Sequence, residues 1–136
     1  MPPRKNAKMQ DLTPIFSPLF RRRKKIAAVY MFGSTATGRD RRGSDIDLAI
    51  IAKKAIDHRE KLRLEADLST RLGRDVDLVV FGQAAPLLQH QILKYGRLVS
   101  ENDPAERVRQ EVLARAEYLD TRRFFREIGG HDETFE

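Results

Sequence analysis

Apolar residues gather into three short runs along the chain, at residues 26–32, 45–51 and 75–81, with polar, glycine-containing segments between them. The first run is apolar throughout, which is typical of a strand buried on both faces. The other two runs each carry two aspartates, one residue apart, at their start. We expect all three to be strands, and a fourth short strand over residues 97–100.

Helical periodicity fills the segments between these runs. The leucines of residues 64–72 recur at one-turn spacing after Asp57 and Glu60, which have the spacing of a capping box. This pattern predicts a helix that ends at Gly73, covers one face of the sheet and joins the second strand to the third. Further helices are expected over residues 13–25, 86–95 and 103–128.

The last of these helices carries an apolar stripe at helical spacing. The stripe consists of Val108, Val112, Ala116 and Leu119. Such a stripe packs either into the core of its own domain or against a partner protein. The sequence does not separate these two interpretations.

Asp45 and Asp47 open the second strand one residue apart. Side chains on a strand alternate between its faces, so these two carboxylates project to the same side while Ile46 projects to the other. Like charges this close repel, and a fold keeps both ionised when a cation sits between them. Mg²⁺ suits this position, since it binds one or two protein carboxylates and completes its shell with water and phosphate oxygens. A metal site is therefore expected here.

Gly33 and Ser34 follow the first strand directly. A turn at this point offers free backbone N–H groups and a hydroxyl donor, which suit phosphate oxygens. Three arginines lie between the glycines of residues 38–43, and a guanidinium group matches the geometry of a phosphate. We therefore expect Gly33, Ser34 and at least one of these arginines, with Arg39 as first choice, to contact a nucleoside triphosphate.

Together these motifs resemble those of the DNA polymerase β-like nucleotidyltransferases. The Gly-Ser of residues 33–34 and the Asp-x-Asp of residues 45–47, ten residues apart, match that family's motif pair. The surrounding Tyr-x-Phe-Gly-Ser and Ser-Asp-Ile-Asp-Leu are similar to the minimal nucleotidyltransferases, antitoxin-type proteins often paired with HEPN toxins. The resemblance covers residues 12–100. One departure is Thr37, which stands where many minimal members have arginine, so a neighbouring arginine would replace it.

The resemblance implies a fold, a site and a reaction. The fold is α/β (α+β), with a small mixed sheet and helices packed on one face. Asp77 on the third strand would complete the metal site with Asp45 and Asp47 and would serve as general base, and Ser44 would join the nucleotide contacts. The reaction would move a nucleoside monophosphate, with AMP from ATP as first choice, to a hydroxyl group of a HEPN-type toxin.

Composition narrows the class and location of the protein. With 26 Lys and Arg against 20 Asp and Glu, the chain carries a formal charge of +6, which suits nucleotides, nucleic acid or an acidic partner. It has no cysteine, so disulfides are excluded and a cytoplasmic location is expected. No apolar run is long enough to span a membrane. One domain is expected over residues 12–128, with flexible segments at residues 1–11 and 129–136.

Alternatives to a toxin-modifying enzyme stay open on the sequence alone. Transfer to a small molecule such as an aminoglycoside is one, although a positive chain does not favour a cationic substrate. Another is a non-catalytic antitoxin, and a third is a nucleic-acid-binding module that uses the basic run of residues 21–25. That run lacks interleaved aromatic residues. It is also explained as the last turn of a helix that begins near Pro14 or Pro18, where basic residues suit the helix dipole.

Overall fold

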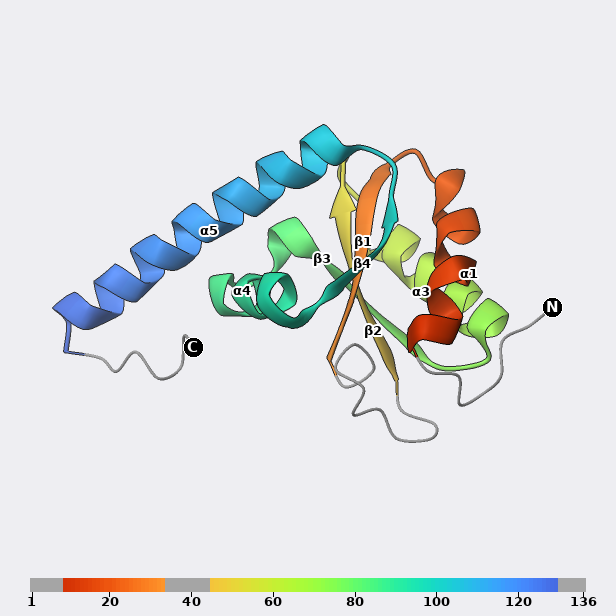
Figure 1. Cartoon of the computed structure of the whole chain (residues 1–136), viewed down its shortest axis with the longest axis horizontal. Helices are drawn as coiled ribbons and strands as arrows, with labels where there is room; N and C mark the ends of the chain where they lie inside the picture. Colours follow the sequence, from red (N-terminus) through yellow and green to blue (C-terminus); the bar gives the residue numbers. More distant parts are fainter. Residues whose placement is uncertain (1–8, 34–44, 130–136) are drawn as a thin grey trace.

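The computed structural model of the chain describes residues 9–33 and 45–129. Four strands form one mixed sheet in the order β3-β2-β1-β4 (Figure 1). The strands are β1 (Ile26–Phe32), β2 (Ile46–Ala52), β3 (Val76–Val80) and β4 (Arg97–Glu101). The helices are α1 (Met9–Arg21), α3 (His58–Leu72), α4 (Pro86–Tyr95) and α5 (Pro104–Glu127), with a short 3₁₀ helix η1 (Phe81–Gln83). β1 is antiparallel to β2 and β4, whereas β2 and β3 are parallel, joined by α3.

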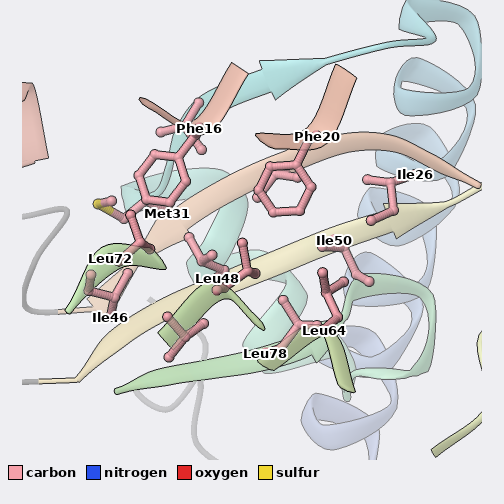
Figure 2. Packing of buried hydrophobic residues seen from close by; sticks show 14 of the residues in the cluster. Phe16, Phe20, Ile26, Met31, Ile46, Leu48, Ile50, Leu64, Leu72 and Leu78 are labelled. Carbon is pink, nitrogen blue, oxygen red and sulfur yellow. The ribbon is translucent and has the colours of Figure 1, made fainter. Parts of the chain in front are cut away.

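Helices cover both faces of the sheet. α1 and α3 pack on one face, and Figure 2 shows Phe16 and Phe20 of α1 beside the apolar side chains of β1 and β2. α4 and α5 pack on the other face, where Ile92 and Ala114 join a second cluster around Tyr30. The expected α+β class with a mixed sheet is confirmed, but the helices are not confined to one face. Alternate residues of β1 and β2 serve two cores, so both faces need cover.

The ends of α3 follow the local signals in the sequence. The side chain of Asp57 accepts a hydrogen bond from the backbone N–H of Glu60 at 2.8 Å. At the other end, Gly73 adopts the left-handed conformation with φ of 66° and donates its N–H to the carbonyl of Ser69. The leucines of residues 64–72 are buried. The predicted capping box, periodicity and stop are therefore confirmed.

The free edge of β3 is closed by side chains of α3. The N–H of Val76 donates to Ser69 Oγ and the N–H of Leu78 donates to Glu65 Oε2, both at 2.9 Å. An edge strand with such bonds cannot offer these donors to another strand. These side-chain bonds therefore disfavour the addition of another strand at β3.

The first helix differs from its prediction in both bounds. It begins at Met9 and ends at Arg21, whereas residues 13–25 were expected. Pro14 and Pro18 consequently lie inside the helix and not in its first turn. Each removes a backbone N–H, but Phe16 and Phe20 are fully buried, so packing holds the helix where propensity would not.

The second half of α5 extends past α4 and the sheet (Figure 1). Glu111, Ala114 and Tyr118 are its buried residues, whereas Val112 and Leu119 of the predicted apolar stripe are each 57% exposed. The stripe therefore faces away from the core of its own domain. Among residues 9–33 and 45–129, no helix is long and apolar enough to cross a membrane.

Candidate functional site

The predicted carboxylates meet at one end of the sheet, where β1 ends and β2 and β3 begin. In the parallel pairing of β2 with β3, Asp47 lies opposite Asp77, and on its other side Asp47 lies opposite Phe32 of β1. Asp45 immediately precedes β2 and is exposed. Because residues in register on adjacent strands point to the same face, Asp47 and Asp77 share the face on which α4 and α5 pack.

The charge on Asp47 is poorly compensated by the protein. Burial raises the pKa of its carboxyl above the usual range, and repulsion from Asp77 and Asp45 raises that pKa further. The three carboxylates are thus close enough to act on one another electrostatically. As placed, no three carboxylate or imidazole side chains in the described parts of the chain form a set that could hold one metal ion.

Gly33 brings the end of β1 against Asp47. Its φ is +75°, a conformation that side-chain-bearing residues rarely adopt. A Cβ added at this position would overlap the Asp47 carboxylate. The backbone conformation therefore favours glycine here, and any side chain would also require the Asp47 carboxylate to move.

The other predicted nucleotide-binding residues belong to the segment between β1 and β2. Ser34, Arg39 and Ser44 lie outside the described residues. Their contact with a nucleotide stays a prediction, as does that of Gly33.

A cavity of about 440 Å³ runs along β3 beside this site. Asp77 lines it together with His58 and Lys61 from the start of α3, and Leu88 of α4 contributes an apolar wall. His58 is exposed, and no sequence motif singles out Lys61. The cavity offers room for part of a substrate next to Asp77.

Sequence reasoning also passed over Arg74. This arginine stands between Gly73 and Asp75 at the same end of the sheet, yet it is only 6% exposed. A charged side chain is seldom buried to this degree without an interaction partner, and Arg74 has such an interaction. Its place between a glycine and an acidic residue is typical of a turn, which explains why no pattern singled it out.

The basic run of residues 21–25 forms part of the surface away from the carboxylates. Only Arg21 lies in the last turn of α1, so the helix dipole accounts for one of the five residues. Arg23 pairs with Asp67 at 2.6 Å and Lys25 with Glu60 at 3.1 Å, and both partners belong to α3. The run therefore helps to fasten the turn before β1 to α3.

Two comparisons match the sequence of this chain to known proteins. The family described as polymerase beta, nucleotidyltransferase, matches residues 16–105. The curated "Protein adenylyltransferase MntA" of Shewanella oneidensis is 36% identical over 73 residues, which cover 54% of this chain and 52% of that protein. The chain thus matches about half the length of this relative.

Solved structures show the same fold. A crystal structure of a toxin-antitoxin with AMP-PNP has a TM-score of 0.68 at 28% identity, over 76% of this chain and 83% of the other. A mutant of the toxin-antitoxin MntA-HpeT has a TM-score of 0.70 at 27% identity, over 85% and 91% of the two chains. Since the family match includes the whole sheet and all three aspartates, this chain belongs to the polymerase beta nucleotidyltransferase family.

Proposed function

We propose that this protein is a Mg²⁺-dependent nucleotidyltransferase that moves AMP from ATP to a hydroxyl group of a HEPN-type toxin, and that it acts as the antitoxin of that pair. The observation that carries the proposal is the pairing of Asp47 with Asp77 on one face of the sheet, with Gly33 against Asp47. The similarity to a protein adenylyltransferase and to a toxin-antitoxin with AMP-PNP supports it.

Asp45, Asp47 and Asp77 are the residues that would hold Mg²⁺. Their oxygen donors suit this ion, and the raised pKa of Asp47 marks negative charge that a divalent cation would neutralise. When bound, Mg²⁺ supplies Lewis-acid stabilisation of the triphosphate and lowers the pKa of the attacking hydroxyl.

The chain's own residues orient the reactants and move the proton. Gly33, Ser34, Arg39 and Ser44 hold the phosphates so that the acceptor oxygen attacks the α-phosphorus in line. The oxygen–phosphorus bond forms as the bond to the β-phosphate breaks, and pyrophosphate leaves. Asp77 takes the proton of the acceptor hydroxyl as general base.

The exposed stripe of α5 supplies a surface for the toxin. Val108, Val112 and Leu119 are 49%, 57% and 57% exposed on a helix whose second half extends away from the sheet. Apolar side chains repeated in this way on an exposed helix fit the groove or helical face of a protein partner. A protein acceptor is therefore proposed before a small-molecule one, and we place the reaction in the cytoplasm, in keeping with the cysteine-free sequence.

The test is a capture from host lysate with Mg²⁺ and labelled ATP, with the parent protein and an Asp45→Asn/Asp47→Asn variant side by side. Mass spectrometry of the retained proteins should find an adenylate adduct on one partner with the parent alone. Retention of the same partner by both proteins without any adduct would instead establish an antitoxin that acts by contact. No retained partner and no adduct would refute both versions.

A further inference from the structure

A basic hollow lies between the end of α1 and the last turns of α3, on the side of the sheet that these two helices cover (Figure 1). Its volume is about 620 Å³. Two apolar residues and four arginines line it: Pro18, Leu19, Arg21, Arg22, Arg23 and Arg71. No described residue lines both this hollow and the cavity beside Asp77. The basic hollow is therefore a different feature from the candidate active site.

The turn between α1 and β1 carries the basic run and is fixed by hydrogen bonds. Asn102, which follows β4, donates through Nδ2 to the backbone carbonyls of Phe20 and Ile26 at 2.8 and 3.0 Å. The N–H of Arg23 donates to the carbonyl of Phe20, and the N–H of Ile26 to the carbonyl of Arg23, both at 3.0 Å. The backbone that presents these cations is thus held in place before a ligand binds, which lowers the entropic cost of binding.

The positive charge around the basic hollow is neutralised only in part by the described side chains. Asp67 pairs with Arg23 at 2.6 Å and with Arg71 at 3.0 Å, so two guanidinium groups share one carboxylate. Arg21 and Arg22 are exposed and form no ion pair with any described side chain. Neighbouring cations repel one another, and an anion bound among them relieves this repulsion. The arrangement therefore favours an anionic ligand.

The composition of the basic hollow favours phosphate groups over an acidic protein. The planar guanidinium group donates two parallel hydrogen bonds to a phosphate, which an ammonium group does not. Protein interfaces have an apolar centre rich in aromatic residues, whereas none of the described residues that line this hollow is aromatic. Most of the exposed large apolar side chains belong instead to α5, which packs on the other face of the sheet.

A chain of phosphates fits this surface better than a single small anion does. The exposed Lys24 continues the positive surface along the turn, beyond the residues that line the basic hollow. Single-stranded nucleic acid is held largely by stacking of its bases on aromatic side chains, which this lining lacks. A double strand presents its phosphates on the outside and is bound through them without such stacking.

We propose that the basic hollow and the turn before β1 bind the phosphate backbone of double-stranded nucleic acid, whatever its base sequence. Arg21 and Arg22 contact phosphate oxygens, and the formal charge of +6 attracts the polyanion at long range. The turn lies at the start of β1 and the carboxylates gather at its end, about 20 Å apart for a strand of 7 residues. A duplex bound here therefore leaves Asp47 and the apolar stripe of α5 uncovered.

The test measures binding of the full chain to a short fluorescein-labelled duplex of mixed sequence, prepared as DNA and as RNA, by anisotropy over a range of salt concentrations. We expect at least one duplex to bind, with an affinity that falls steeply as salt rises. Arg21→Gln/Arg22→Gln should weaken binding about tenfold at low salt, and should lower the slope of log affinity against log salt by about 2.

The matched control is Arg97→Gln/Arg123→Gln. It removes two exposed arginines outside the basic hollow that also form no ion pair with the described side chains, so the change in net charge is the same. Its affinity and salt slope should stay near those of the parent. Arg21→Lys/Arg22→Lys keeps both charges and should restore the slope, which separates a lost phosphate contact from damage to the end of α1. Thermal unfolding checks that every variant is folded.

Four results would overturn the proposal. These are absence of binding to both duplexes at low salt, equal losses in the two glutamine variants, tighter binding of the single strand than of the duplex, and binding of inorganic tripolyphosphate without binding of a duplex. The last result would assign the basic hollow to a small polyphosphate. Competition by tripolyphosphate against a bound duplex is expected, since both place phosphate groups among the same arginines.

Discussion

Asp47 and Glu111 both lie on the α4 and α5 side of the sheet, yet their surroundings move their pKa values in opposite directions. Burial raises the pKa of Asp47, and the nearby Asp77 raises it further. Burial acts on Glu111 in the same sense, but hydrogen bonds from Tyr30 and Arg107 outweigh it and hold the pKa of Glu111 below its usual range. One carboxylate has its partners within the chain, and the other faces further carboxylates.

The partners of Glu111 fasten α5 to β1. The Tyr30 hydroxyl donates to Glu111, and Arg107 Nη1 donates to the same carboxylate at 2.7 Å. Burial is the main cause of a raised pKa of Tyr30, so the hydroxyl stays protonated as a donor. Arg107 also pairs with Glu101 of β4. The carboxylate of Glu111 thus has hydrogen-bond donors within the chain, whereas Asp47 is flanked by further carboxylates, where we propose that a cation binds.

The largest effect is expected at Asp77. Asp77→Asn should lower the rate of nucleotide transfer by more than about a hundredfold, because even groups that only support a metal ligand typically contribute 10–100-fold. The matched control is Asp75→Asn, an exposed aspartate just before β3. Initial rates of label transfer from ATP measure both. Equal losses in the two variants would show that Asp77 has no special place.

Glu111→Ala should lower the free energy of unfolding by about 2–3 kcal/mol, because it leaves Tyr30 and Arg107 without their buried acceptor. Urea unfolding measures this change. Asp120→Ala removes an exposed carboxylate from the same helix and should change stability by less than about 0.5 kcal/mol. Indistinguishable midpoints for the two variants would contradict the anchoring role of Glu111.

Comparing Gly33 with Gly73 separates two contributions to the stability cost of a Gly→Ala substitution, backbone strain and steric overlap. Both glycines have positive φ, but an added Cβ meets nothing within 4 Å at Gly73 and overlaps Asp47 at Gly33. Gly73→Ala should therefore cost only the backbone strain of about 1 kcal/mol, and Gly33→Ala about 1 kcal/mol more. Thermal unfolding compares them. In the double variant Gly33→Ala/Asp47→Ala, the extra stability cost of Gly33→Ala over Gly73→Ala should disappear. If it persists, overlap with Asp47 is not its cause.

The smallest effect is a pair of opposite pH dependences. The folded pKa of Asp47 is raised, so its contribution to stability is present in acid and is lost as pH rises through that pKa. The folded pKa of Glu111 is lowered, so its contribution is present above its unfolded pKa and is lost as pH falls through the folded pKa.

In unfolding measured from pH 3 to pH 7 without metal, Asp47→Asn should slightly raise the free energy of unfolding at neutral pH and have little effect in acid. Glu111→Gln should lower it at neutral pH, with a deficit that shrinks in acid. Parallel pH curves for the two variants would contradict the comparison between the carboxylates.

The elements that sequence predicted well are those with local causes. The strand over residues 26–32 is apolar throughout, and Asp57 with Glu60 makes a cap that depends on four consecutive residues. The start of α1 was missed because Pro14 and Pro18 are typical of a first turn, whereas buried Phe16 and Phe20 stabilise a helix around them. Which face each helix covers depends on contacts between distant segments, and no local pattern records it.

The residues of the candidate site also divide into those with a local sequence signal and those brought together by contacts between distant segments. Period-two alternation is enough to place Asp45 and Asp47 on one side of β2. That Asp77 lies beside Asp47 follows from the parallel pairing of β2 with β3, which only the family resemblance had implied. Lys61 and Arg71 belong to cavities formed by several elements, so neither could be found from its neighbours in sequence.

The fate of each phosphate of ATP tests the proposed nucleotide transfer most directly. The captured partner is incubated with the protein, Mg²⁺ and ATP labelled either in the α-phosphate or in the γ-phosphate, and the label retained on the partner is counted. We expect the partner to retain the α-label but not the γ-label, and Asp47→Asn to abolish retention of the α-label. Retention of the γ-label would show phosphoryl transfer and contradict the assignment of a nucleotidyltransferase reaction to these carboxylates.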